Sequence, residues 1–206
     1  MLKSVDYYCA NPLAFAQNIR FIDTDMNRSY HQNLDGYEAT RANQLLSHIR
    51  QQNYKYILDI HTTTTEVGGC LIIGERSEAT DTIINAAPNL KNIIIMKKYI
   101  AKTSLLSASS SIVAVEFNHT LSEKIETLDT LTDMLENLAS TKKQQPVARD
   151  FYKVVDYITA NEIAKDEPPA NFAQHTNGKY PVLSGGDLQN RTYGGFWTEK
   201  LPVEYI

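Results

Sequence analysis

The sequence has few of the features that mark disulfide-rich or nucleic-acid-binding proteins. Its 206 residues include only two cysteines, Cys9 and Cys70, which cannot form a disulfide framework. Basic residues are not in excess, because 20 Lys and Arg stand against 24 Asp and Glu, for a net charge of −4 at pH 7. This balance argues against nucleic acid, or an anionic membrane surface, as the main partner.

Long apolar runs are also missing. No stretch approaches the roughly 18 apolar residues of a membrane helix, and the opening MLKSVDYYCANP lacks the basic and then apolar pattern of a signal peptide. Cys70 lies in an apolar strand pattern typical of a buried thiol, which favours a reducing, cytoplasmic location. A hydrophobic content of 42% and a charged content of 21% are ordinary for a globular chain of one domain, or one with a small appendage.

Apolar patterns that alternate between strand and helix predict an α/β fold. Strands are expected at 5–9, 54–62, 68–75, 92–100 and 111–119, and helices at 35–52, 77–90 and 119–141. Such alternation predicts a mostly parallel sheet flanked by helices. The buried stripe of the last helix is expected at Leu121, Ile125, Leu128, Leu131, Leu135 and Leu138.

The composition of the sequence changes near residue 145, where proline, glycine and turn dipeptides become frequent. This change predicts two domains: an α/β domain over 1–144 and a small β-rich C-terminal domain over 145–206.

No G-x-G-x-x-G after a strand, P-loop, G-x-S-x-G or H-E-x-x-H occurs, so chemistry has to be found in local clusters. The first is ILDIHTTTTE, 57–66, where Asp59 and His61 lie two residues apart and so share one side of a strand. An acid that holds one imidazole nitrogen prepares the other for a metal. A strand-end histidine bonded to backbone is an equally good interpretation.

The second cluster is VAVEFNH, 113–119, in which Glu116 interrupts an apolar strand near its carboxyl end. A partly desolvated carboxylate with a raised pKa suits a general acid or base. An ordinary strand-end acid bonded to loop amides is the alternative. His119 is either a second polar group of the same site or the start of the next helix.

The third cluster is RFIDTDMNRSY, 20–30. Arg20 could polarise a carbonyl, and Arg28 with Asn27 could bind a carboxylate. Asp23 and Asp25 would hold the arginines in position. Taken alone, the stretch fits a salt-bridged surface loop better than a functional cluster.

Taken in order, ANP with RFIDTDMNR, then DIHTTTT, then VAVEFNH resemble the succinylglutamate desuccinylase/aspartoacylase family over residues 9–120. The resemblance implies a zinc-carboxypeptidase-like fold, Zn²⁺ as cofactor and hydrolysis of the amide bond of a small-molecule N-acyl amino acid. It implies that His61 is a zinc ligand and that Glu116 activates water and protonates the leaving amine. It further implies that Arg20 polarises the scissile carbonyl and that Asn27 and Arg28 bind the α-carboxylate.

Two departures from the family pattern stand out. The family takes two more zinc ligands from an upstream His-x-x-Glu, which occurs nowhere in this sequence. The stretch TSLLSASSSIV also lacks the arginine with which aspartoacylases hold a second carboxylate, which argues against N-acetylaspartate.

Three explanations for the missing ligands stay open: a fragment that begins after that segment, a relative that has lost its metal, or ligands from another chain. The fragment is favoured because the other motif residues are intact. The alternative function is a metal-free carboxylate-binding module or an inactive remnant. A chain without its first strand would also expose a sheet edge, which could favour a homo-oligomer.

Overall fold

The computed structural model describes residues 5–97, 99–118, 124–140, 144–159, 161–162, 168–185 and 193–206. Helices and strands follow the order α1 (Pro12–Gln17), η1 (Met26–Arg28), α2 (Tyr37–Gln52), β1 (Ile57–Thr63), β2 (Cys70–Ile73), α3 (Glu78–Ala86), β3 (Asn92–Ile95), η2 (Leu105–Ser107), β4 (Ile112–Asn118), α4 (Lys124–Ala139), β5 (Ala148–Thr159), β6 (Tyr180–Val182), β7 (Tyr193–Lys200) and β8 (Glu204–Tyr205). His119 and the start of the predicted helix at 119–141 lie outside the described residues.

The strands form one mixed eight-stranded sheet in the order β1-β4-β2-β3-β5-β7-β6, with β8 paired to β5. The pairs β1/β4, β2/β3 and β3/β5 are parallel. The strand β2 runs antiparallel to β4, and the C-terminal strands join antiparallel. The predicted α/β class is confirmed. Strands from both sides of residue 144 share this sheet. The division into two domains stays a prediction.

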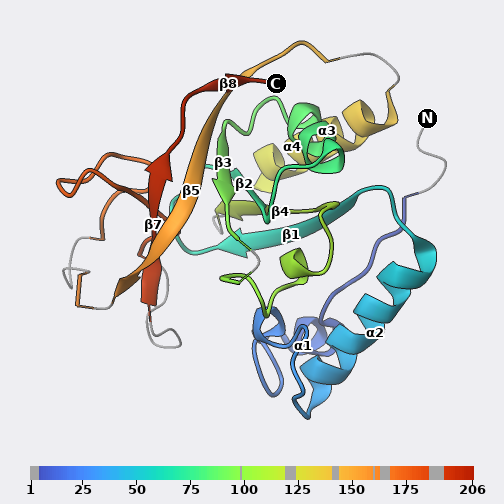
Figure 1. Ribbon diagram of the computed structural model, residues 1–206. Coiled ribbons are helices and arrows are strands. Elements are labelled where there is room, and N and C mark those ends of the chain that lie inside the picture. The colour runs from blue at the N-terminus through green and yellow to red at the C-terminus, as the bar shows by residue number, and fades with distance from the viewer. Residues whose placement is uncertain are drawn as a thin grey trace.

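Helices cover both faces of the sheet, with α3 and α4 on one side and α2 on the other (Figure 1). Strand residues alternate between two hydrophobic clusters, as the pleat requires. On β4, Val113 and Val115 belong to the cluster under α3 and α4, whereas Ile112 and Ala114 face the α2 side. Glu116 continues the α2-side series along the strand, and Phe117 continues the other.

Local signals in the sequence explain where the helices begin and end. Asn11 caps α1 through its side chain, with Pro12 following at the first helical position. Ser77 and Thr80 form a reciprocal capping box at the start of α3. Asn53 ends α2 in a left-handed conformation with φ of 50°.

The strand predicted at 5–9 is wrong. The segment belongs to no strand and lies along α2, where Arg41 donates to the carbonyls of Cys9 and Ala10. Near its start, the Tyr54 hydroxyl donates to Asp6 at 2.7 Å. A β-strand needs a sheet edge for its backbone groups, whereas here the carbonyls of Cys9 and Ala10 are satisfied by a side chain of α2.

The predicted stripe of α4 is also only partly right. Leu128 and Leu135 are exposed, at 64% and 37% of their surface, whereas Leu131, Met134 and Leu138 pack on the core. Spacing of seven residues keeps leucines on one face, but the helix turns a neighbouring face toward the sheet. Side chains of Leu121 and Ile125 lie outside the described residues.

Candidate functional site

The parallel pairing of β1 with β4 brings the first two sequence clusters together. In this register His61 is directly opposite Glu116 and Asp59 is opposite Ala114. His61 Nε2 lies 2.9 Å from a carboxylate oxygen of Asp59, as the spacing of two residues predicted. The imidazole is thereby held in one orientation with its other nitrogen, Nδ1, turned away from Asp59.

Electrostatics favour a charged His61 ring in the metal-free protein. Burial acts to lower the pKa of His61, but the charge and hydrogen bond of Asp59 oppose this effect. Together with the more distant carboxylates of Glu116 and Asp25 they raise the pKa to about 9. The site is therefore rich in negative potential, which is what a cation requires.

Cys70 lies on β2, beside Glu116 of β4, but its thiol is unreactive. It pairs with Glu116 on the other side, where β2 runs beside β4. Burial, reinforced by the charge of Glu116, raises the pKa of the Cys70 thiol. The group therefore stays protonated, which makes it a poor nucleophile and a poor metal ligand.

The third cluster, the 20–28 loop, reaches the same place through Asn27. The Asn27 side-chain nitrogen lies 3.5 Å from His61 Nδ1. The Asp25 carboxylate accepts from Asn27 N at 2.9 Å and so caps the short helix η1. The hydroxyl of Thr103 donates to the carbonyl of Asn27 at 3.1 Å, which fixes the turn from its other side.

Asp25 also holds Arg20, as the sequence predicted. Arg20 donates through Nη2 at 2.7 Å and through Nε at 3.3 Å to the same Asp25 oxygen. Burial would raise the pKa of Asp25, but the bonds from Arg20 and Asn27 and the charges of Arg20 and Arg28 hold it below its ordinary value. The Asp25 carboxylate therefore contacts both Arg20 at the start of the loop and the backbone of Asn27 near its end.

Among the described residues, Asp23 is bonded to the start of α2 and to no arginine, contrary to expectation. Its carboxylate accepts from the backbone N–H of Tyr37 at 2.7 Å and so satisfies the start of α2. Arg28 lies in the same short helix as Asn27 and donates to the Asn27 carbonyl at 3.0 Å. Arg28 itself is exposed.

Sequence reasoning missed two residues that support the loop, Thr103 and Glu38. Glu38 is fully buried and accepts backbone N–H groups of the loop. A signal for Glu38 was present, because it lies on the helical face that also carries Ala42, Leu45 and Ile49. An acidic residue on an apolar helical face must find hydrogen-bond donors when it is buried.

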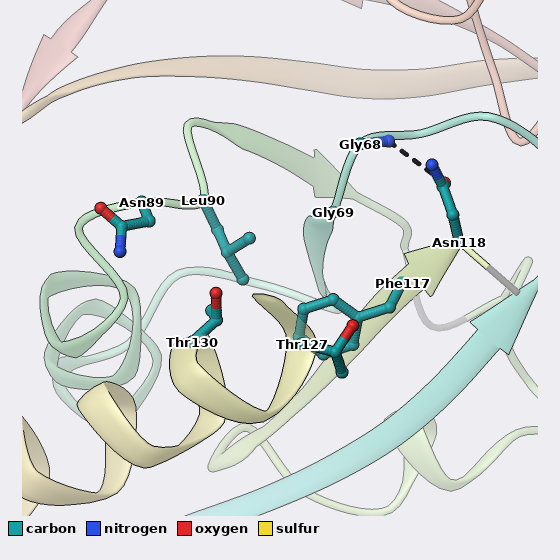
Figure 2. A pocket seen from close by; sticks show the side chains of 8 residues that line it. All are labelled: Gly68, Gly69, Asn89, Leu90, Phe117, Asn118, Thr127 and Thr130. Atoms are coloured by element: carbon teal, nitrogen blue, oxygen red, sulfur yellow. Dashed lines mark hydrogen bonds between the residues drawn. The ribbon is translucent and has the colours of Figure 1, made fainter. Parts of the chain in front are cut away.

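A separate cavity of about 210 Å³ lies on the other face of β4 (Figure 2). Phe117 and Leu90 give it an apolar floor, while Thr127 and Thr130 of α4 add hydroxyls. Asn118 borders it and accepts the Gly68 N–H at 3.2 Å. Because Phe117 and Glu116 point to opposite faces of the strand, this cavity is not part of the His61 site.

The described residues do not make up a complete metal site. Among them, no group of three or more His, Cys, Asp and Glu side chains is arranged to hold a metal ion. His61, with Asp59 behind it, has the chemistry of one ligand. Likewise, no helix within the described ranges is long and apolar enough to cross a membrane.

Residues 3–140 match the profile of the succinylglutamate desuccinylase/aspartoacylase catalytic domain, and the chain belongs to this family. Members of this family are typically zinc-dependent amidohydrolases that act on N-acyl amino acids.

The curated relatives that match are similar over short stretches. An N-acyl-aromatic-L-amino acid amidohydrolase (carboxylate-forming) of Xenopus laevis is 30% identical over 80 residues, which cover 34% of this chain and 26% of that protein. The human protein of the same name is 39% identical over 75 residues, covering 31% and 24%. A probable aspartoacylase of Prochlorococcus marinus (strain AS9601) is 35% identical over 78 residues, covering 33% and 26%. The matched part therefore spans about a quarter of each relative.

Solved structures extend the likeness over nearly the whole chain, at the level of fold. Murine aminoacylase 3 superposes with a TM-score of 0.70 at 18% identity, covering 96% of this chain and 85% of that one. The succinylglutamate desuccinylase from Chromobacterium violaceum gives 0.69 at 13% identity, covering 94% and 72%. The carboxypeptidase-like α/β fold expected from the sequence is confirmed.

Proposed function

We propose that this chain forms the substrate-binding and proton-transfer part of an enzyme that hydrolyses the amide bond of an N-acyl amino acid. The observation that carries the proposal is the approach of Asn27 to His61, with 3.5 Å between Asn27 Nδ2 and His61 Nδ1. It joins the 20–28 loop to the strand ends that hold His61 and Glu116, so all three clusters serve one site.

The carboxylate of the substrate is assigned to Asn27 and Arg28. Arg28 is exposed, and its guanidinium offers a planar fork that matches a carboxylate. Arg20 is assigned to the carbonyl oxygen of the scissile amide. Because Asp25 accepts the Nε hydrogen and one Nη2 hydrogen of Arg20, the two Nη1 hydrogens and the second Nη2 hydrogen remain to serve a substrate.

Proton transfer is assigned to Glu116. It stands opposite His61 at the carboxyl end of β4, where parallel strands of α/β proteins present their reactive groups. A carboxylate there can take a proton from the attacking water and return it to the departing amine. Asp59 positions His61, and Asp25 positions both Arg20 and the Asn27 turn.

Zinc is the cofactor proposed from the family, with His61 Nδ1 as one ligand. When bound, zinc supplies an acidified water and a Lewis acid. A catalytic zinc typically takes three protein ligands, and His61 is the one that the described residues provide.

A metal-free carboxylate-binding module is the second candidate. The observation that favours it is the same lack of a three-ligand group within the described residues. Such a module would keep Asn27 and Arg28 but would not turn over substrate.

Zinc analysis combined with an activity assay separates the two candidates. The purified chain is dialysed, analysed for zinc and assayed for amine release from N-acetyl-L-tyrosine and N-acetyl-L-aspartate. His61→Ala is the test variant, and His175→Ala, an exposed histidine, is the matched control. Near-stoichiometric zinc and amine release from N-acetyl-L-tyrosine, both lost only in His61→Ala, support the enzyme. Binding of either probe without zinc or turnover supports the module, and neither binding nor turnover overturns both.

A further inference from the structure

Glu38 is a buried carboxylate whose bonding partners lie in the loop that forms the site. It occupies the first turn of α2 and has 0% exposed surface. One carboxylate oxygen accepts from Ile22 N at 2.6 Å and from the side chain of Asn11 at 2.9 Å. The other accepts from Asp23 N at 3.0 Å and Thr24 N at 3.3 Å.

The loop in turn accepts a hydrogen bond from the start of α2. The Asp23 carboxylate accepts from Tyr37 N at 2.7 Å, so each segment satisfies backbone groups of the other. Gly36 permits this approach, because it has φ of +110° and any Cβ there would lie 2.8 Å from an Asp23 carboxylate oxygen. We call these residues, Asn11, 22–24 and 36–38, the Glu38 cluster.

The chemistry of the cluster requires an ionised Glu38. All four groups that contact it are N–H donors, and a charged carboxylate is a pure acceptor. Burial acts to raise the pKa of Glu38, but the bonds from Ile22, Asp23, Asn11 and Thr24 outweigh it and hold the pKa below its ordinary value. The start of a helix further favours negative charge.

The position of the bonded loop residues in the chain links the Glu38 cluster to the candidate site. The three amides that Glu38 holds lie between Arg20 on one side and Asn27 and Arg28 on the other. We propose that Glu38 is a positioning residue that fixes the 20–28 loop, so that Asn27 and Arg28 meet the substrate carboxylate. The inference rests on the proposed function, and it adds a specific dependence of substrate binding on α2.

Glu38→Gln is the direct test. The side chain keeps its size, but its amide nitrogen then faces N–H donors, so at least one loop amide loses its acceptor. We expect Kd or KM for N-acetyl-L-tyrosine to rise about tenfold. We expect kcat to fall by a smaller factor, about threefold, because His61 and Glu116 are held by β1 and β4 and only Arg20 of the groups assigned to the reaction lies in the loop.

Hydrogen exchange provides the structural readout. In Glu38→Gln, exchange of the peptide covering 20–28 is expected to quicken, while that of β4, residues 112–118, stays at the wild-type rate. Glu78→Gln is the matched control, because Glu78 also lies in the first turn of a helix but is exposed. It should change neither readout.

If Glu38→Gln does not fold, as judged by circular dichroism, Asp23→Ala replaces it. This variant removes the exposed half of the Glu38 cluster and should weaken probe binding about threefold, with the same local exchange. Wild-type binding and wild-type exchange in the folded variant overturn the inference. A wild-type chain that binds no probe overturns the proposed function and this inference with it, and that failure is distinguishable because it appears before any substitution.

Discussion

Arg149 is expected to be the polar side chain on which the stability of this fold depends most. It is fully buried on β5, and its hydrogen bonds within the described residues go to backbone carbonyls at the end of α3 and in the turn that follows. Nη1 contacts the carbonyls of Ala87 and Leu90 at 2.9 Å each, and Nη2 contacts that of Ile84 at 2.8 Å. Burial lowers the pKa of Arg149, which reflects the cost of keeping its charge away from water.

Arg149→Met keeps the length of the side chain and removes its donors. Three buried carbonyls then lose a short hydrogen bond to a charged donor, each worth about 1.5–3 kcal/mol. The carbonyls of Ile84 and Ala87 keep one backbone donor each, which limits the loss. Because the variant no longer buries a guanidinium charge, it also avoids the desolvation cost of that charge, which offsets part of this loss. We therefore expect unfolding free energy to fall by about 3 kcal/mol, and the midpoint of thermal unfolding to fall by roughly 6–12 °C.

Urea denaturation followed by circular dichroism measures this loss. Arg50→Met is the matched control, because Arg50 lies at the end of a helix, α2, but is exposed. Its cost should stay within about 0.5 kcal/mol. Equal, small losses in both variants would refute the assignment of Arg149 as the group that satisfies the end of α3.

Three further predictions concern the loop glycines and the two glutamates. Gly69→Ala should lower the unfolding free energy by about 2 kcal/mol in urea denaturation, because φ is +83° and the added Cβ would lie 2.8 Å from the Leu90 side chain. Gly68→Ala should lower it by about 1 kcal/mol, because no atom lies within 4 Å of the added Cβ. The folded-state pKa of Glu38 lies below its ordinary 4.5, so its stabilisation is present above that pH and is lost as pH falls through the folded-state pKa. The stability difference between wild type and Glu38→Gln should therefore narrow in acid, and a constant difference would contradict this sign. Glu116→Gln should reduce kcat by about 10²–10⁴-fold at unchanged zinc content, and near-wild-type turnover would remove Glu116 from proton transfer.

Contacts between near neighbours in the chain were predictable from the sequence. The Asp59–His61 pair follows from strand periodicity, and the Arg20–Asp25 pair follows from opposite charges in one turn. The helices at α2 and α3 follow from apolar spacing and from capping residues such as Ser77. In each case, the forces that decide the structure act within a few residues.

Contacts that depend on long-range placement were not predictable in the same way. Residues 5–9 have strand-like composition, but whether they form a strand depends on a free sheet edge, which local sequence does not specify. The leucine spacing of α4 allowed two neighbouring faces, and packing against α3 and the sheet selected the one with Met134. Asp23 was assigned to an arginine by charge alone, but the start of α2 offered it a backbone donor instead.

The two halves of the candidate site are supported by different parts of the fold. His61 and Glu116 are held by the backbone pairing of β1 with β4, which is continuous with the hydrophobic core. The 20–28 loop has no strand of its own and depends on side chains, chiefly Glu38 and Thr103. Core pairing opens only with the whole protein, whereas a loop held by side chains can open locally. Substrate binding should therefore fail before the strand-held residues are disturbed, so mild heating or denaturant would raise KM while the β4 amides stay protected from exchange.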